Sequence, residues 1–121
     1  MNKRILVVED QEDNRRIMRD LLVTAGFEVI EATDGKKGLS VAATEHPDLI
    51  LMDLQLPVID GLEATRRIKS NPATSHIPVI AVTSFAMSGD NEKALAAGCD
   101  AYYSKPVSPR TLLAKIREYL P

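Results

Sequence analysis

The stretch Leu49-Ile50-Leu51-Met52-Asp53 decides the fold, because four consecutive apolar residues end on a carboxylate. An unbroken apolar run of this length is typical of a strand buried on both faces, as in a parallel sheet covered by helices. The segment 27–30 instead alternates around Glu28, which predicts an edge strand with one wetter face. The pattern predicts five strands, at residues 5–8, 27–30, 49–52, 79–82 and 101–104.

Amphipathic helices are predicted between these strands. From Gln11 to Ala25 the core-facing positions recur at steps of three and four, and Gly26 then ends the helix. Ser108 and Pro109 supply the N-cap and the first position of the last helix. The predicted helices cover residues 11–25, 36–45, 62–70, 90–97 and the segment from 109 onward.

Strands that alternate with helices predict the α/β class, here a doubly wound five-stranded parallel sheet with right-handed crossovers. The 121 residues are enough for one hydrophobic core and leave no room for a second folded unit. No linker, repeat or low-complexity segment interrupts the pattern. We therefore expect one domain over residues 1–121, without an output domain.

The composition is that of an ordinary globular protein, with 45% hydrophobic and 26% charged residues and a formal net charge of -2. This balance disfavours a basic face for nucleic acid. A single cysteine, Cys99, cannot form an internal disulfide, and we expect it to be a buried structural thiol in a reducing compartment. No apolar run is long enough for a signal sequence or a membrane span. The sequence predicts a cytoplasmic protein that binds neither membranes nor nucleic acid.

Polar residues follow four of the five predicted strands. In a doubly wound sheet, ligands bind outside the carboxyl ends of the strands, so these side chains are expected to meet at one edge. One such residue alone is most often a turn or cap residue, but compatible groups after four separate strands make coincidence a poor explanation. The candidates are Glu9, Asp10, Asp53, Thr83, Ser84 and Lys105.

Three carboxylates at one edge require positive charge, because two unit charges ~4 Å apart repel by about 4 kcal/mol at an effective dielectric of 20. Lys105 supplies one positive charge, and a divalent cation would supply the rest. Oxygen ligands without histidine or cysteine favour Mg²⁺ or Mn²⁺. Because Mg²⁺ is usually held by one or two carboxylates, a third carboxylate is left as a nucleophile that can form an aspartyl phosphate.

The sequence resembles the receiver domain of two-component response regulators. The resemblance implies a CheY-like, flavodoxin-like (βα)5 fold with strand order 2-1-3-4-5. Residues 85–90 and 99–108 also resemble single-domain cell-division regulators of that family. The matching motifs are Ile5-Leu6-Val7-Val8-Glu9-Asp10, Leu49-Ile50-Leu51-Met52-Asp53-Leu54-Gln55-Leu56-Pro57, Asp60-Gly61, Pro78-Val79-Ile80-Ala81-Val82-Thr83 and Tyr102-Tyr103-Ser104-Lys105-Pro106.

The resemblance implies a role for each acid. Asp53 would be the phosphoacceptor. Asp10 would bind Mg²⁺ directly, together with Asp53 and the backbone carbonyl of Gln55. Glu9 would contact the ion through water; the commonest acid pair in the family is Asp-Asp, and the longer arm of Glu9 can still reach in this way.

The resemblance also implies how the phosphoryl group is held and sensed. Lys105 would pair with the phosphoryl oxygens, and a cis peptide bond to Pro106 would aim it. Thr83 and the backbone N–H groups of Leu54 and Ser84 would donate hydrogen bonds to the same oxygens. Alanine often stands where this chain has Ser84, which is also small enough to leave Asp53 accessible.

Two further pairs of residues would govern the response. Thr83 would move toward the phosphoryl group and Tyr102 would rotate inward, which would make these two residues the switch. Gln55 and Phe85 would set the lifetime of the phosphoryl group.

The implied partners are proteins. The phosphoryl donor would be a phosphohistidine on a sensor histidine kinase or a histidine phosphotransfer protein. The output would be a downstream protein that binds the face made of the fourth helix, fifth strand and fifth helix. The chain would be a phosphoacceptor that assists its own phosphorylation and dephosphorylation, not a turnover enzyme. We expect a monomer, or a dimer that forms on phosphorylation.

Three alternatives remain. A flavin-binding protein of this architecture would need a phosphate loop after the first strand, where the acidic Glu9-Asp10-Gln11-Glu12-Asp13 stands instead. A turnover phosphatase with an aspartyl nucleophile typically has a second acid two residues later, where this chain has Gln55. A pseudo-receiver that binds partners without phosphate would not need the complete set of acids, threonine and lysine.

Overall fold

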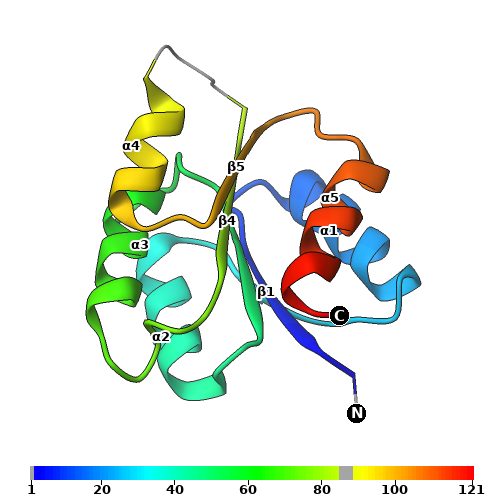
Figure 1. Cartoon of the computed structure of the whole chain (residues 1–121), viewed down its shortest axis with the longest axis horizontal. Coiled ribbons are helices and arrows are strands. Elements are labelled where there is room, and N and C mark those ends of the chain that lie inside the picture. Colours follow the sequence, from blue (N-terminus) through cyan, green and yellow to red (C-terminus); the bar gives the residue numbers. More distant parts are fainter. Residues whose placement is uncertain (1, 85–88) are drawn as a thin grey trace.

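A parallel sheet forms the centre of the structure (Figure 1). The computed structural model describes residues 2–84 and 89–121, and within them five parallel strands pair in the order β2-β1-β3-β4-β5. This confirms the predicted fold class and strand order. The strands are β1 (Arg4–Val8), β2 (Glu28–Ala32), β3 (Leu49–Met52), β4 (Val79–Thr83) and β5 (Ala101–Ser104).

The edge strand β2 begins later than the sequence predicts. Phe27 is not part of the strand, because its amide donates to the carbonyl of Leu22 at 3.0 Å and so closes the preceding helix. The strand runs on to Ala32 instead, since all five residues of β1 find a partner in β2, from Arg4 opposite Glu28 to Val8 opposite Ala32.

The helices cover both faces of the sheet. On one side lie α1 (Glu12–Thr24) and α5 (Pro109–Tyr119), and on the other α2 (Gly35–Glu45), α3 (Gly61–Ser70) and α4 (Asp90–Ala97) (Figure 1). All five begin and end within about two residues of their predicted bounds. Ser108 precedes α5 as predicted, but its side chain makes no capping hydrogen bond.

Double coverage explains the unbroken apolar runs. Alternate residues of a strand point to opposite faces, and both faces are buried here. Leu6 and Ile50 belong to the core beneath α2, α3 and α4, whereas Ile5 and Leu49 belong to the core beneath α1 and α5. All four side chains are fully buried, and each contributes about 1.5–3 kcal/mol to folding.

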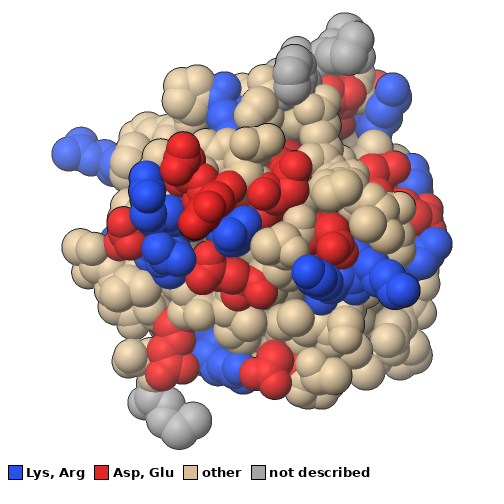
Figure 2. All heavy atoms as spheres, turned by 180° about the vertical axis from the view of Figure 1, so that it is seen from behind, with Lys and Arg blue, Asp and Glu red and all other residues tan. Residues whose placement is uncertain are grey.

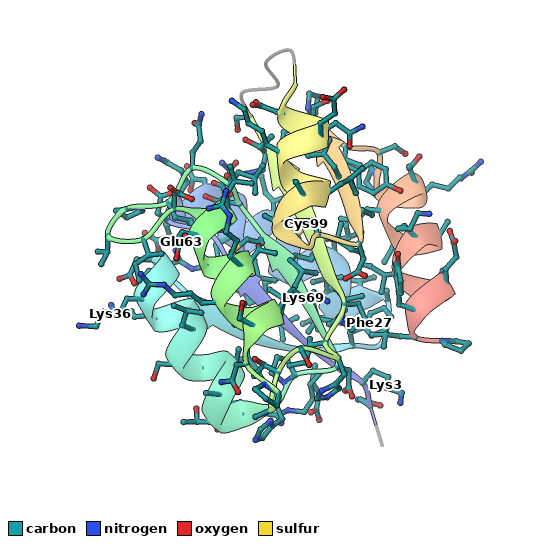
Figure 3. The ribbon with its side chains drawn as sticks, turned by 60° about the vertical axis from the view of Figure 1, so that its left-hand side comes forward. Lys3, Phe27, Lys36, Glu63, Lys69 and Cys99 are labelled. Carbon is teal, nitrogen blue, oxygen red and sulfur yellow. The ribbon has the colours of Figure 1, made fainter. Side chains whose placement is uncertain are left out.

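At the amino-terminal edge of the sheet, Lys69 of α3, labelled in Figure 3, links the segments that lead into β4 and β5. Its ammonium group donates to the carbonyl of Ile77 at 2.7 Å and to the carboxylate of Asp100 at 3.0 Å. The same oxygen of Asp100 accepts the amide of Val79 at 2.8 Å. Nearby, Cys99 is buried with its sulfur 3.8 Å from the Thr65 hydroxyl, and burial raises the pKa of the thiol. Cys99 is thus the buried thiol that the sequence predicts.

Surface charge is mixed. Acidic and basic side chains are interspersed over the face drawn in Figure 2. Among the described residues, no helix has the length and apolarity that crossing a bilayer requires.

Gly61 lets α3 begin directly against the backbone that follows β3. Its amide donates to the carbonyl of Leu54 at 2.9 Å. A Cβ atom at this position would lie 2.1 Å from the carbonyl oxygen of Asp53, far inside van der Waals contact. Only glycine therefore fits here, because any side chain would displace the backbone of Asp53.

We predict that Gly61→Ala lowers the free energy of unfolding by about 2 kcal/mol in urea denaturation, because the new methyl group forces the Asp53 backbone away. The control is Gly26→Ala, where φ is +97° but no atom lies within 4 Å of the added Cβ. That variant should lose only about 1 kcal/mol, from the left-handed backbone. Amide resonances of Asp53 and Leu54 should shift in the first variant alone, and identical spectra there would contradict the argument.

Candidate functional site

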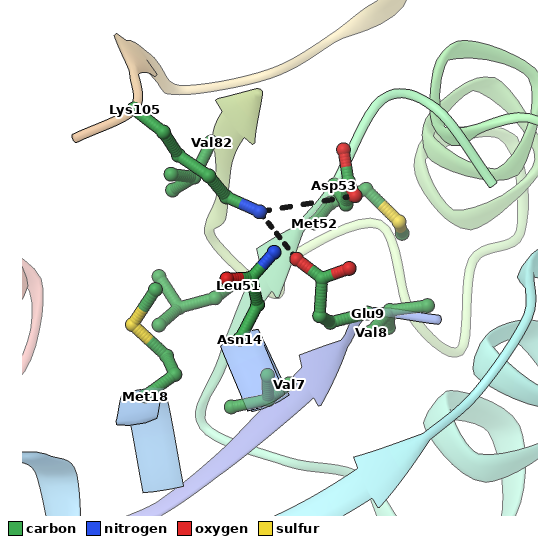
Figure 4. Close-up of a pocket in the computed structure, with 10 residues that line it drawn as sticks. All are labelled: Val7, Val8, Glu9, Asn14, Met18, Leu51, Met52, Asp53, Val82 and Lys105. Atoms are coloured by element: carbon green, nitrogen blue, oxygen red, sulfur yellow. Dashed lines mark hydrogen bonds and ion pairs between the residues drawn. The ribbon is translucent and has the colours of Figure 1, made fainter. Parts of the chain in front are cut away.

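Four strands place polar residues at one edge of the sheet, and Figure 4 draws three of them, Glu9, Asp53 and Lys105. Glu9 follows β1, Asp53 follows β3, Thr83 ends β4 and Lys105 follows β5. In Figure 4 the lysine side chain extends toward both carboxylates. The structure therefore brings together the predicted site residues of four separate strands.

Lys105 is the cation at the centre of the site. Its ammonium group forms an ion pair with Oε1 of Glu9 and lies 3.9 Å from Oδ2 of Asp53. The relative exposure of Glu9 is 4% and that of Asp53 is 9%. The charges thus interact where water screens them little. The peptide bond between Lys105 and Pro106 is cis, as the resemblance implies.

Glu9, Asp10 and Asp53 form a cluster of acids. Each offers a carboxylate oxygen, and these oxygens all lie within 4.8 Å of one another. A cleft of about 200 Å³ opens over Asp10 and Asp53. Its lining residues are Asp10, Gln11, Asn14, Asp53, Gln55 and Ser84.

Burial and charge shift the pKa values of Glu9 and Asp53 in opposite directions. Burial alone would raise the pKa of Glu9, but hydrogen bonds from the ammonium group of Lys105 and the amide of Gln11 outweigh it and lower that pKa. For Asp53, burial dominates and the negative charge of Glu9 adds to it, so that its pKa rises to about 6. Glu9 is therefore the ionised partner of Lys105, and the more distant Lys105 offsets the burial of Asp53 only in part.

Backbone groups fix the carboxylate of Asp53. The amide of Gln55 donates to Oδ1 at 3.1 Å, and the amide of Asp53 itself donates to the carbonyl of Val8 at 3.1 Å. The cleft and Lys105 lie close to the same carboxylate. Asp53 is thus oriented by the protein yet borders open space.

The two predicted switch residues lie on one face of the sheet. Thr83 pairs with Ser104 and Ala81 pairs with Tyr102, so Thr83 and Tyr102 are diagonal neighbours on adjacent strands. Thr83 is 1% exposed. The ring of Tyr102 packs against the core beneath α2, α3 and α4, and its hydroxyl is buried without a hydrogen-bond partner among the described residues. Phe85, expected to affect the phosphoryl lifetime, lies outside the described residues.

Two residues of α1 belong to the site although the motifs do not indicate them. Asn14 lines the cleft, and Arg15 donates to the backbone carbonyl of Glu9 at 3.1 Å. The one available signal was Asn14, a polar residue in the apolar stripe of a predicted helix. Nothing in the sequence distinguishes Arg15 from its neighbour Arg16.

The fold and this set of residues are those of a signalling receiver domain. The model of the response regulator receiver domain matches residues 5–117. The chain therefore belongs to the response regulator receiver family of two-component signal transduction.

Its curated relatives include DivK proteins. The chain is 48% identical over 120 residues to the polar-differentiation response regulator DivK of Brucella ovis and 47% identical to that of Brucella anthropi. Both alignments cover 99% of this chain and 98% of the relative. The likeness to cell-division regulators that residues 85–90 and 99–108 indicate agrees with these relatives.

Solved receiver structures superpose closely. A CheY-like receiver domain protein from Methanospirillum hungatei is 35% identical with a TM-score of 0.92, and the match covers 99% of this chain and 94% of that one. The receiver domain of a sensor histidine kinase from Pseudomonas aeruginosa is 34% identical with a TM-score of 0.91, and the match covers 98% of each chain. That second structure has a magnesium ion coordinated in its active-site cleft.

The raised pKa of Asp53 predicts a dependence of stability on pH. Because the folded value of about 6 lies above the usual 3.8, the folded protein keeps a proton that the unfolded chain releases, and stability falls as pH rises through this window. In chelator at pH 7.5, Asp53→Asn should raise the free energy of unfolding by about 2 kcal/mol. This gain should fade as the pH falls from 6 to 3.8. Asp20→Asn, whose side chain is 72% exposed, controls for the lost charge. An equal gain in both variants would contradict the prediction.

Proposed function

We propose that Asp53 accepts a phosphoryl group from a phosphohistidine on a sensor histidine kinase or a histidine phosphotransfer protein. The observation that carries the proposal is the setting of Asp53. This carboxylate is nearly buried, borders an open cleft, lies 3.9 Å from Lys105 and belongs to a three-acid cluster. A carboxylate with a purely structural role would need neither the cleft nor the extra acids.

The acid cluster fits a divalent metal ion. Its donors are all oxygens, which suits Mg²⁺ or Mn²⁺, and Lys105 offsets the charge of Asp53 only in part. We propose that Asp10, Asp53 and the backbone carbonyl of Gln55 hold the ion, with Glu9 contacting it through water. When bound, such an ion neutralises negative charge on the transferring phosphoryl group.

The residues of this chain then have distinct tasks in the transfer. An oxygen of ionised Asp53 forms a bond to phosphorus while the phosphorus–nitrogen bond to the donor imidazole breaks, and the electron pair leaves with the imidazole. The amide of Gln55 keeps the carboxylate oriented, as its hydrogen bond to Oδ1 indicates. Catalysis of this kind consists mostly of positioning and electrostatics.

Lys105 is placed to exchange partners during this reaction. In the structure its ammonium group pairs with Glu9, yet Asp53 is close enough for the same group to reach oxygens bound to it. We propose that Lys105 pairs with the phosphoryl oxygens, which also accept hydrogen bonds from the Thr83 hydroxyl and the backbone N–H groups of Leu54 and Ser84. The phosphoryl group of the product carries about −1.5 to −2 charge, in place of the single negative charge of the ionised carboxylate.

The added charge would act on the face made of α4, β5 and α5. Thr83 drawn toward the phosphoryl group would leave room for its diagonal neighbour Tyr102, whose buried hydroxyl has no hydrogen bond among the described residues to hold it in place. On α4, Leu95 is 49% exposed, and we propose that it offers an apolar contact to a partner protein. Phosphorylation would thus shift an existing equilibrium between two packings of this face. No feature of the site favours a phosphate-independent pseudo-receiver.

The chemistry is tested by intact mass after incubation with acetyl phosphate. We expect one phosphoryl adduct that requires Mg²⁺, disappears in chelator and is absent from Asp53→Asn. Lys105→Met should form the adduct more slowly by about 10²-fold, because a preorganised charge opposite the transferring group is lost. A folded protein without an adduct under any condition would overturn the proposal.

The switch is tested with Tyr102→Ala, which should accept the phosphoryl group at the wild-type rate. Hydrogen exchange at α4 and β5 should change on phosphorylation in the wild type but not in this variant, because the ring that couples Thr83 to the surface is gone. Tyr102→Phe is the matched control: it keeps the ring, removes a hydroxyl that has no partner among the described residues, and should respond like wild type. An unaltered response in Tyr102→Ala would show that the coupling runs elsewhere.

A further inference from the structure

The loop that carries Glu9 and Asp10 is held by few contacts. The amide of Glu9 donates to the carbonyl of Ala32 at 3.0 Å, and beyond this bond the chain leaves the sheet. Gln11 occupies the N-cap position of α1 but its side chain makes no capping hydrogen bond. The side chain of Glu9 is held by the amide of Gln11 at 3.1 Å and by Lys105, and the contact made to the carbonyl of Glu9 then helps to place the backbone between the two acids.

Arg15 is the side chain that contacts this carbonyl. Its Nη1 donates to the backbone oxygen of Glu9 at 3.1 Å, and its Nε donates to Oε1 of Glu31 on β2 at 3.1 Å. Glu31 also accepts from Arg19 at 3.2 Å. The guanidinium of Arg15 thus connects the acid loop to the edge strand of the sheet.

We call this connection, from Glu31 through the guanidinium of Arg15 to the backbone of Glu9, the Glu31 brace. The side chain of Arg15 is 16% exposed and that of Glu31 is 30% exposed, so the pair is better shielded from water than a surface ion pair. The planar guanidinium donates from two nitrogens in fixed geometry, which a lysine cannot do. Because the backbone oxygen of Glu9 is held in this way, a shift of that backbone would also displace the side chains of Glu9 and Asp10.

We propose that Arg15 is a positioning residue that sets the affinity of the acid cluster for its divalent ion, by holding the Glu9-Asp10 backbone through the Glu31 brace. This inference rests on the metal site described under the proposed function. Contacts that orient metal ligands from behind typically change metal affinity by about 10–100-fold when they are removed.

The sign of the effect separates positioning from simple electrostatics. Arg15 carries positive charge, so removing it would by Coulomb interaction alone strengthen the binding of a cation. Positioning predicts the opposite, a weaker site. Loss of packing alone would reduce stability without changing the affinity of the folded protein for the metal.

The experiment is a titration of the unphosphorylated protein with Mn²⁺, in which electron paramagnetic resonance measures free Mn²⁺, with urea denaturation of each variant in parallel. Arg15→Met should weaken Mn²⁺ binding about tenfold. Arg15→Lys should fall between this variant and wild type, because it keeps the charge but not the two-point contact. Arg16→Met is the control: it removes the same charge one residue away, where within the described residues the arginine forms an ion pair with the exposed Asp13 at 3.4 Å. This variant should bind Mn²⁺ as tightly as wild type or slightly more tightly.

Several outcomes would overturn the inference. Wild-type affinity in Arg15→Met, or an equal loss in Arg16→Met, would show that the brace does not position the acids. If Arg15→Met does not fold, Arg15→Lys decides: Mn²⁺ binding as tight as that of wild type would refute the role. Failure of the wild-type protein to bind Mn²⁺ would instead refute the metal site itself, and that result is distinct from a wild-type site that is indifferent to Arg15.

Discussion

Repulsion among Glu9, Asp10 and Asp53 is the constraint on which the site depends. Their oxygens lie within 4.8 Å of one another, and Lys105 is the cation that faces two of them. The fold keeps the carboxylates together because each acid lies within two residues of the end of a buried strand, β1 or β3. The folding free energy of the sheet therefore holds these like charges together. A divalent ion, or a proton on Asp53, would reduce their repulsion.

The parallel sheet makes this concentration of charge possible. Strands that run in one direction end at one edge, and their two faces are sealed by helices, so the polar residues that follow the strands have only that edge to occupy. The fit is close at Gly61, where a Cβ atom would overlap the carbonyl of Asp53. Stability and chemistry are thus coupled through the same few backbone atoms.

Much of this arrangement could be predicted from sequence, and the failures are instructive. Unbroken apolar runs identify β1, β3 and β4 because residues 5–8, 49–52 and 79–82 are all buried. The edge strand β2 was misplaced at its start, since the amide of Phe27 makes a local capping bond to the end of α1, which the alternation around Glu28 does not indicate. The site acids, Thr83 and Lys105 could be found because each follows or ends a strand. Arg15 could not, because its value lies in a contact with a backbone oxygen and with Glu31, which are visible only once β2 is placed beside β1.

The ion pair between Lys105 and Glu9 joins residues 96 positions apart in the chain. A contact of such long range forms only when both ends of the chain are in place, since β5 must add to β4 before Lys105 can approach β1 across the sheet. During synthesis, β1, β2 and β3 leave the ribosome first and carry all three acids without their cation. Under the proposed mechanism, the emerging chain lacks the charge that speeds phosphoryl transfer until its last strand has docked, so that full reactivity accompanies the completion of folding.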